Sequence, residues 1–184
     1  MTTDPIPMSG REMGAVVALL AASSVALTFG FACALPLAAF AAISALVFQS
    51  RAAVGAVLAV WLVNQIVGFS FLHYPTDPST IAWGLALGVI GLLSLGTAFL
   101  VLSRLDGLVG ILASFLAAFV VYEGAIYIAC VASGTGVGSF TAPIVTRIFL
   151  INAASFGGLL AARELLARTG LRRRTEASAA LHHA

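Results

Sequence analysis

Charged residues are scarce in this chain of 184 residues: they make up 9% of it, whereas 61% of the residues are hydrophobic. A soluble domain carries about 25% charged residues. So few polar side chains cannot cover the surface of a globule that faces water. Lipid must then take the place of water around most of the chain. The composition predicts an all-α fold, a polytopic bundle of transmembrane helices.

Lysine is absent, and all nine basic residues are arginine. The net charge of only +2 does not suggest a nucleic-acid partner. Cysteine is rare as well, and the spacing of Cys33 and Cys130 matches no metal or redox motif. A disulfide between the two is one reading, and two small apolar residues in helix interfaces is the other.

Residues for catalysis are missing too. Of the seven acidic residues only Glu123 falls deep within an apolar segment, so no pair of carboxylates is available for hydrolysis or for a two-metal site. The glycine-rich stretch 134–138 follows no strand and has no lysine after it, unlike a phosphate-binding loop. The sequence therefore predicts no enzyme activity, no cofactor and no metal site.

The first apolar run, from Gly14 to Phe48, is too long for one span. As a single helix it would measure over about 50 Å, against a hydrocarbon core of about 30 Å. Gly30 and Pro36 offer a break, because proline lacks the amide hydrogen and disfavours helix just before it. Two alternatives stay open: a five-helix bundle with 14–48 as one span, and a cleavable signal peptide ending near Ala32-Cys33-Ala34.

Six transmembrane helices are expected, separated by loops rich in Pro, Gly, Ser and Thr. They are placed at 14–32, 36–49, 52–72, 80–102, 107–132 and 143–166, with a polar tail at 1–13 and a basic tail at 167–184.

Arginine positions predict the orientation. Arg51, Arg104 and the arginines from Arg163 onward fall at alternate helix ends, whereas the loops 73–79 and 133–142 hold no basic residue. Because short cytoplasmic loops are enriched in Lys and Arg, both termini are expected in the cytoplasm.

Polar side chains inside the apolar segments gather in the outer halves of the helices at 52–72, 107–132 and 143–166. A carboxylate at a helix centre costs about 2.5–3.5 kcal/mol on insertion scales, and such residues usually face the bundle interior and mark a function. We therefore predict a ligand-binding pocket in the outer half. Its candidate residues are Asn64, Gln65, His73, Tyr74, Tyr122, Glu123, Tyr127, Arg147 and Asn152.

Some of these residues could instead have purely structural roles. Glu123 and Arg147 could form an ion pair that only joins two helices. Asn64 and Asn152 could be hydrogen-bonding residues between helices, worth about 0.6 kcal/mol each. The spacing Gly84-x-x-x-Gly88 indicates close helix packing, and packing within the bundle is the ordinary explanation.

The segment Trp61-Leu62-Val63-Asn64-Gln65-Ile66-Val67-Gly68-Phe69, followed by His73-Tyr74-Pro75, resembles a pattern in small bacterial inner-membrane proteins associated with cobalt or vitamin B12 uptake. In size and six-helix layout the chain is similar to the substrate-capturing subunits of energy-coupling-factor transporters. The resemblance implies a location in the bacterial inner membrane. It also implicates Asn64, Gln65, His73 and Tyr74 in the site.

Two function classes follow. The leading hypothesis is a solute-uptake component that lies in the lipid bilayer and captures a small molecule or ion from the outer side, with a partner membrane subunit or a homo-oligomer completing transport. The alternative is a structural or accessory subunit without a ligand, which would make contacts through the Gly84/Gly88/Gly91 face and the arginine tail.

Overall fold

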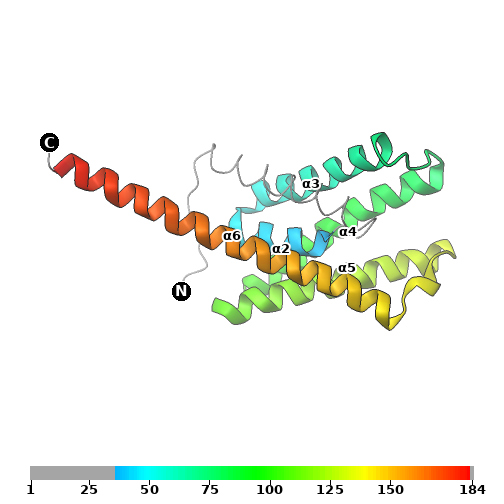
Figure 1. Cartoon of the computed structure of the whole chain (residues 1–184). Helices are drawn as coiled ribbons and strands as arrows, with labels where there is room; N and C mark the ends of the chain where they lie inside the picture. The colour runs from blue at the N-terminus through cyan, green and yellow to red at the C-terminus, as the bar shows by residue number, and fades with distance from the viewer. Residues whose placement is uncertain (1–35, 183–184) are drawn as a thin grey trace.

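The computed structural model describes residues 36–182, and the side chains of residues 36–165. This part of the chain is helical and contains no strand (Figure 1). Its elements are α2 (Leu37–Val47), α3 (Ser50–Ser70), α4 (Pro78–Leu102), α5 (Gly107–Ser133), the 3-10 helix η1 (Val137–Ser139) and α6 (Ala142–His182). The predicted tail 1–13 and the predicted helix 14–32 lie outside the described residues.

Four helices are long and apolar enough to cross a membrane: α3, α4, α5 and the Ala142–Leu165 part of α6. Each of them exposes large apolar side chains on its surface. On α4 a stripe is formed by Ile81, Leu85, Val89 and Leu93, all exposed and four residues apart. In water such a surface would be an aggregation hazard. The structure therefore supports the predicted multi-pass membrane protein.

Helix α2 departs from the prediction of a membrane span at 36–49. It begins directly after Pro36, where the break was predicted, but has only 11 residues. At about 1.5 Å per residue it is about 16 Å long, roughly half the hydrocarbon core. Every residue from Leu37 to Leu46 is buried. The prediction of a span here is wrong, because the apolar character of α2 reflects burial in protein rather than contact with lipid.

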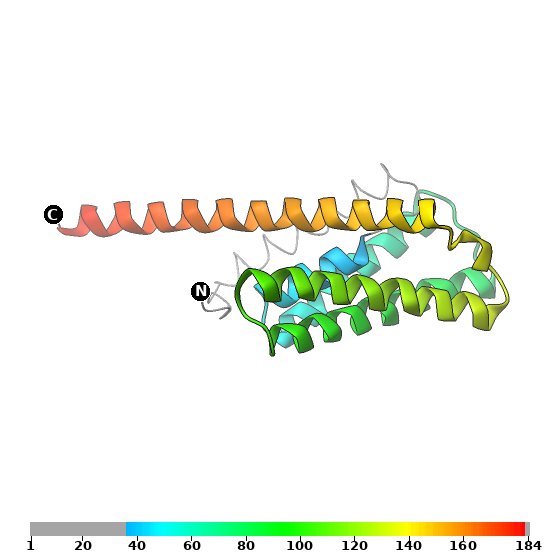
Figure 2. The same ribbon diagram turned by 90° about the horizontal axis from the view of Figure 1, so that it is seen from below.

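The two ends of the bundle differ, and each is named here after one of its residues. The Tyr74 end holds the connections 71–77 and 134–141, and the Arg104 end holds the connections 48–49 and 103–106 (Figure 2). Because α2 leads directly into α3 at the Arg104 end, its short length places its first turn near mid-bundle. It packs there against α3, α4, α5 and α6. Within residues 36–182 the bundle therefore consists of four long helices around one half-length helix.

Close packing against α4 uses its glycines. A Cβ atom on Gly88 would lie 2.9 Å from Trp61 Cε2, and one on Gly91 would lie 2.5 Å from Leu37 Cδ2. The Trp61 indole Nε1–H donates to the Gly84 carbonyl at 2.7 Å. Packing within the bundle is confirmed, and this face is not free for a partner.

Helices α5 and α6 are joined by four phenylalanines that the sequence analysis did not single out. The rings of Phe115 and Phe156 stack at 4.7 Å, and Phe119 meets Phe149 edge to face at 5.1 Å. These contacts pack the part of α6 that contains Phe149 and Phe156 against α5.

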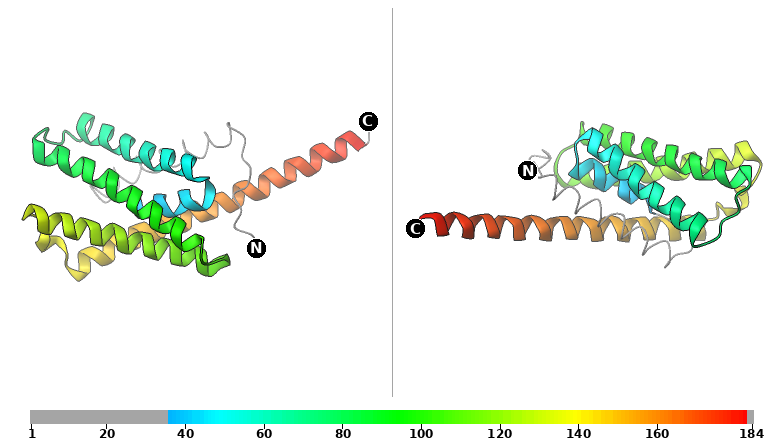
Figure 3. Two further views of the ribbon diagram at one scale, coloured as in Figure 1. Left: turned by 180° about the vertical axis from the view of Figure 1, so that it is seen from behind. Right: turned by 90° about the horizontal axis from the view of Figure 1, so that it is seen from above.

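Helix α6 continues well past the predicted end at residue 166, as far as His182. Its 41 residues span about 62 Å, twice the hydrocarbon core, so the helix projects from the Arg104 end (Figure 3). The segment predicted as a separate tail, 167–184, is rich in Arg, Ala and Leu, which favour helix. Nothing stops the helix at residue 166, because no proline follows it.

Candidate functional site

A cavity of about 730 Å³ lies at the Tyr74 end, between the four long helices and above the first turn of α2. Both connections at this end contribute to its wall. The lining residues are Leu37, Asn64, Gln65, Phe69, Tyr74, Thr80, Trp83, Gly84, Leu87, Tyr122, Glu123, Ile126, Cys130, Gly136, Ser139, Phe140, Ile144, Val145, Arg147, Ile148 and Ile151. Ligand pockets commonly measure about 300–1,000 Å³ and are mostly apolar with a few polar groups.

Six of the nine predicted site residues line this one cavity, and they come from three helices and one connection. They are Asn64, Gln65, Tyr74, Tyr122, Glu123 and Arg147. The structure therefore brings together six of the residues that the sequence placed in or near the outer halves of the helices. Their role in binding stays a prediction.

The other three predicted residues lie elsewhere. His73 is exposed in the α3–α4 connection, with a positive φ of 55°. The Tyr127 side chain is 45% exposed, and its ring meets Phe140 edge to face at 5.0 Å. Neither residue lines the cavity.

Asn152 is buried to 1% exposure and acts within the protein. Its Oδ1 accepts a hydrogen bond from the Ala39 backbone amide at 3.2 Å, and its Nδ2 donates to the Ile148 carbonyl at 3.0 Å. Ala39 lies in the first turn of α2, where backbone amides have no partner within their own helix. Asn152 thus caps α2 from α6. It forms a hydrogen bond between two helices, which is the structural role given as the alternative to ligand binding in the sequence analysis.

Glu123 brings a carboxyl group to the cavity wall from the middle of α5. Its Oε1 atom is buried and has no hydrogen-bond partner among the described residues. A buried polar atom without a partner costs about 1–3 kcal/mol, and more when it is charged. No ion pair within 4.0 Å joins Glu123 to Arg147, although both residues line the cavity. The structural ion pair considered in the sequence analysis is therefore not formed.

The shape of the cavity near α3 depends on two glycines. A Cβ atom on Gly68 would lie 2.7 Å from the Tyr74 ring, so glycine lets that ring fold back across the end of α3. A Cβ atom on Gly84 would lie 2.5 Å from Gln65 Oε1. Glycine at these two positions makes room for two of the predicted polar side chains.

Aromatic side chains form much of the remaining wall, and sequence reasoning missed them. Phe69, Trp83 and Phe140 line the cavity together with Tyr74 and Tyr122. The signal that could have found Phe69 is its position four residues after Gln65, on the same face of α3. Cys130, which also lines the wall, carries a free thiol, and Cys33 lies outside the described residues.

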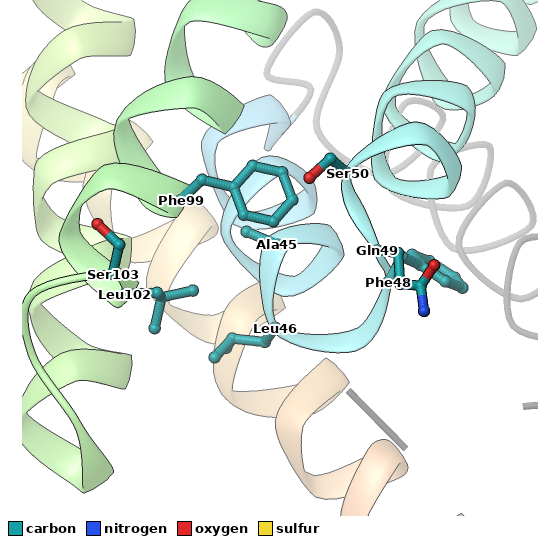
Figure 4. Close-up of a pocket in the computed structure, with 8 residues that line it drawn as sticks. All are labelled: Ala45, Leu46, Phe48, Gln49, Ser50, Phe99, Leu102 and Ser103. Carbon is teal, nitrogen blue, oxygen red and sulfur yellow. The ribbon is translucent and has the colours of Figure 1, made fainter. Parts of the chain in front are cut away.

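The floor of the cavity is closed by α2, whose first residue Leu37 lines it. A second cavity of about 340 Å³ lies at the opposite, Arg104 end, between the end of α2 and the end of α4 (Figure 4). Its wall includes Phe48, Phe99 and Leu102 but no charged side chain. The fully buried α2 and its neighbours Leu95 and Val57 fill the space between the two cavities.

Comparisons of the chain with protein-family models, with curated proteins and with solved structures found no match. The site must therefore be interpreted from its own chemistry. It offers a buried carboxyl oxygen, a guanidinium, two amides and an aromatic wall in one cavity. This set suits binding and orienting a small molecule.

Proposed function

We propose that this protein is an integral membrane component that captures a small ligand from the outer side of the membrane. The observation that carries the proposal is Glu123, which lines a ligand-sized cavity and whose buried Oε1 atom has no hydrogen-bond partner among the described residues. Intramembrane ionisable residues are costly and usually belong to a substrate pathway or a partner. A bound solute would supply the missing partner.

The orientation rests on arginine. Arg51 and Arg104 both lie at the Arg104 end, from which α6 also projects, and the two connections at the Tyr74 end contain no Lys or Arg. By the positive-inside preference the Arg104 end faces the cytoplasm, and the cavity then faces outward.

Capture rather than complete transport is proposed, because α2 lies across the route. Among the side chains of residues 36–165, the fully buried polar ones are those of Ser44, Ser94, Ser114 and Asn152, and none of these four is charged. Passage of a polar solute would need α2 to move, or a partner subunit or second copy to complete the path. The link to cobalt or vitamin B12 uptake is carried only by the resemblance around Asn64 and Tyr74.

A binding screen on the purified protein in lipid nanodiscs tests the proposal. A solute at about 100 times its Kd should stabilise the folded protein by about 2.7 kcal/mol. Glu123→Gln should abolish that shift while the protein stays folded. Glu164→Gln is the matched control, since Glu164 is exposed on α6 near the Arg104 end and lies outside the cavity.

Failure of a broad solute library to shift the wild-type protein, with Glu123→Gln more stable than wild type, would contradict ligand capture. The buried Glu123 side chain would then lower the free energy of unfolding, and no bound ligand would offset that loss.

A second candidate, an accessory subunit of a membrane complex, is favoured by one observation. The part of α6 beyond Leu165 extends past the other described helices at the Arg104 end in Figures 1 and 3. A truncation after residue 166 should abolish co-purification of a partner and leave ligand binding intact. Loss of ligand binding in that variant, with no partner found for the full chain, would speak against this candidate.

A further inference from the structure

Two opposite charges share the cavity without pairing with each other. Glu123 and Arg147 both line it, and no ion pair within 4.0 Å joins them. Opposite charges attract each other, so a site that holds an acidic and a basic side chain apart forgoes a favourable contact. A ligand that brings a charge of opposite sign to each of them would recover the interaction energy.

The two groups sit at different depths. Glu123 is ten residues before the end of α5 at Ser133, about 15 Å below the Tyr74 end. Arg147 is five residues after the start of α6 at Ala142, about 7 Å below that end. Arg147 is exposed, whereas Glu123 Oε1 is buried. The negative charge is therefore deep and the positive charge is near the mouth.

The same cavity also has aromatic side chains in its wall. Phe69, Trp83 and Tyr122 line the same cavity. Aromatic faces attract a cation, most strongly where it is desolvated, and they pack well against an apolar or aromatic body. The wall thus complements a cationic group at the deep end and an apolar body beside it.

A ligand with one charge would satisfy only half of this site. A simple cation could pair with Glu123 but would leave the guanidinium of Arg147 facing its own positive charge. A simple anion could pair with Arg147 but would leave Glu123 Oε1 without a partner. Because an unpaired buried charge is expensive, the site favours a molecule that carries both charges.

We propose that the captured ligand is a small zwitterion: an ammonium group that pairs with Glu123, an acidic group that pairs with Arg147, and an aromatic or apolar body against the wall. This inference rests on the proposed function and names the chemical class of its solute. An aromatic α-amino acid is the simplest molecule of this class.

Three probes with one shared body test the proposal by calorimetry at pH 7 on the full chain in nanodiscs. Phenylalanine carries both charges, phenethylamine lacks the acid, and 3-phenylpropionate lacks the amine. Because a hydrogen bond between charged groups is worth about tenfold or more in affinity, phenylalanine should bind at least about tenfold more tightly than either other probe.

Two variants assign the charges. Glu123→Gln should weaken phenylalanine and phenethylamine about tenfold or more and leave 3-phenylpropionate unaffected. Arg147→Gln should weaken phenylalanine and 3-phenylpropionate and leave phenethylamine unaffected. Arg51→Gln and Glu164→Gln, both exposed and outside the cavity, are the matched controls and should change none of the three affinities.

Each other outcome overturns the proposal in a recognisable way. Equal affinity for phenethylamine and phenylalanine, with no effect of Arg147→Gln, would make the ligand a simple cation. If no probe binds but an uncharged solute from the wider screen does, the zwitterion is wrong and ligand capture stands. If no solute of any class binds the folded wild-type protein, the proposed function falls as well.

Discussion

The cap on α2 allows one prediction to be worked through in detail. Asn152→Leu keeps a side chain of similar size in the same buried position but removes the oxygen that accepts from the Ala39 amide at 3.2 Å. That amide lies in the first turn of a helix that is buried along nearly its whole length, where no water can replace the lost acceptor.

The expected magnitude follows from the burial. A buried donor left without a partner costs about 1–3 kcal/mol. Loss of a side-chain cap at a helix N-terminus costs about 0.5–2 kcal/mol. Both figures describe the same hydrogen bond, so they do not add, and we expect about 2 kcal/mol. For a chain of this size that corresponds to a Tm lower by about 4–8 °C.

The assay is thermal unfolding in detergent, followed by tryptophan fluorescence. Ser155→Ala is the matched control on the same helix, because its hydroxyl donates only to the Ile151 carbonyl one turn earlier in α6. That variant should change the free energy of unfolding by less than about 0.5 kcal/mol. Ligand affinity of the folded Asn152→Leu protein should equal that of wild type, because Asn152 does not line the cavity.

A stability for Asn152→Leu within about 0.5 kcal/mol of wild type would refute the reasoning, because the cap would then contribute nothing to holding α2 in place. A loss of ligand affinity at unchanged stability would return Asn152 to the role that the sequence predicted for it.

Two further predictions concern α4. Gly91→Ala should destabilise the fold by about 1–3 kcal/mol, because the new Cβ atom would lie 2.5 Å from Leu37 Cδ2. Gly96→Ala is the matched control and should not destabilise the fold, because a Cβ atom there would have nothing within 4 Å. Equal unfolding midpoints for the two variants would contradict this packing. Asp77 caps the start of α4, and its side-chain hydrogen bond with Thr80 is the main cause that lowers its pKa below the ordinary value of 3.8. Because the folded pKa is the lower one, the cap stabilises the protein above about pH 4 and is lost as the pH falls through the folded value. A pH titration of the unfolding midpoint should show this loss in wild type and not in Asp77→Ala.

The start of α4 and the end of α5 were predictable because their signals are local. Pro78 and Asp77 mark the start of α4, and Gly134 adopts the left-handed conformation that ends α5. The break before α2 follows from Pro36 alone. Hydropathy identified these apolar segments, because lipid and protein interior both exclude polar side chains.

Hydropathy could not separate lipid contact from burial in protein, and α2 shows the consequence. Its sequence is as apolar as a span, yet it is surrounded by four helices and lies at the centre of the bundle. Only the tertiary arrangement decides which apolar segment takes that position. The length of the predicted segment, 14 residues from 36 to 49, was the available hint, since apolar segments of 10–14 residues are more often buried core helices.

For the site, the sequence by itself determined which polar residues share a depth, because helix rise and the arginine positions together fix how far along a span each residue lies. Tertiary structure decided which of them meet. It turned Glu123 and Arg147 toward one cavity without pairing them, and it turned Asn152 toward the first turn of α2. The physical reason is that the depth of a residue depends only on its distance along its own helix. The direction in which its side chain points depends on how that helix is rotated against its neighbours, and the packing of all the side chains together sets this rotation.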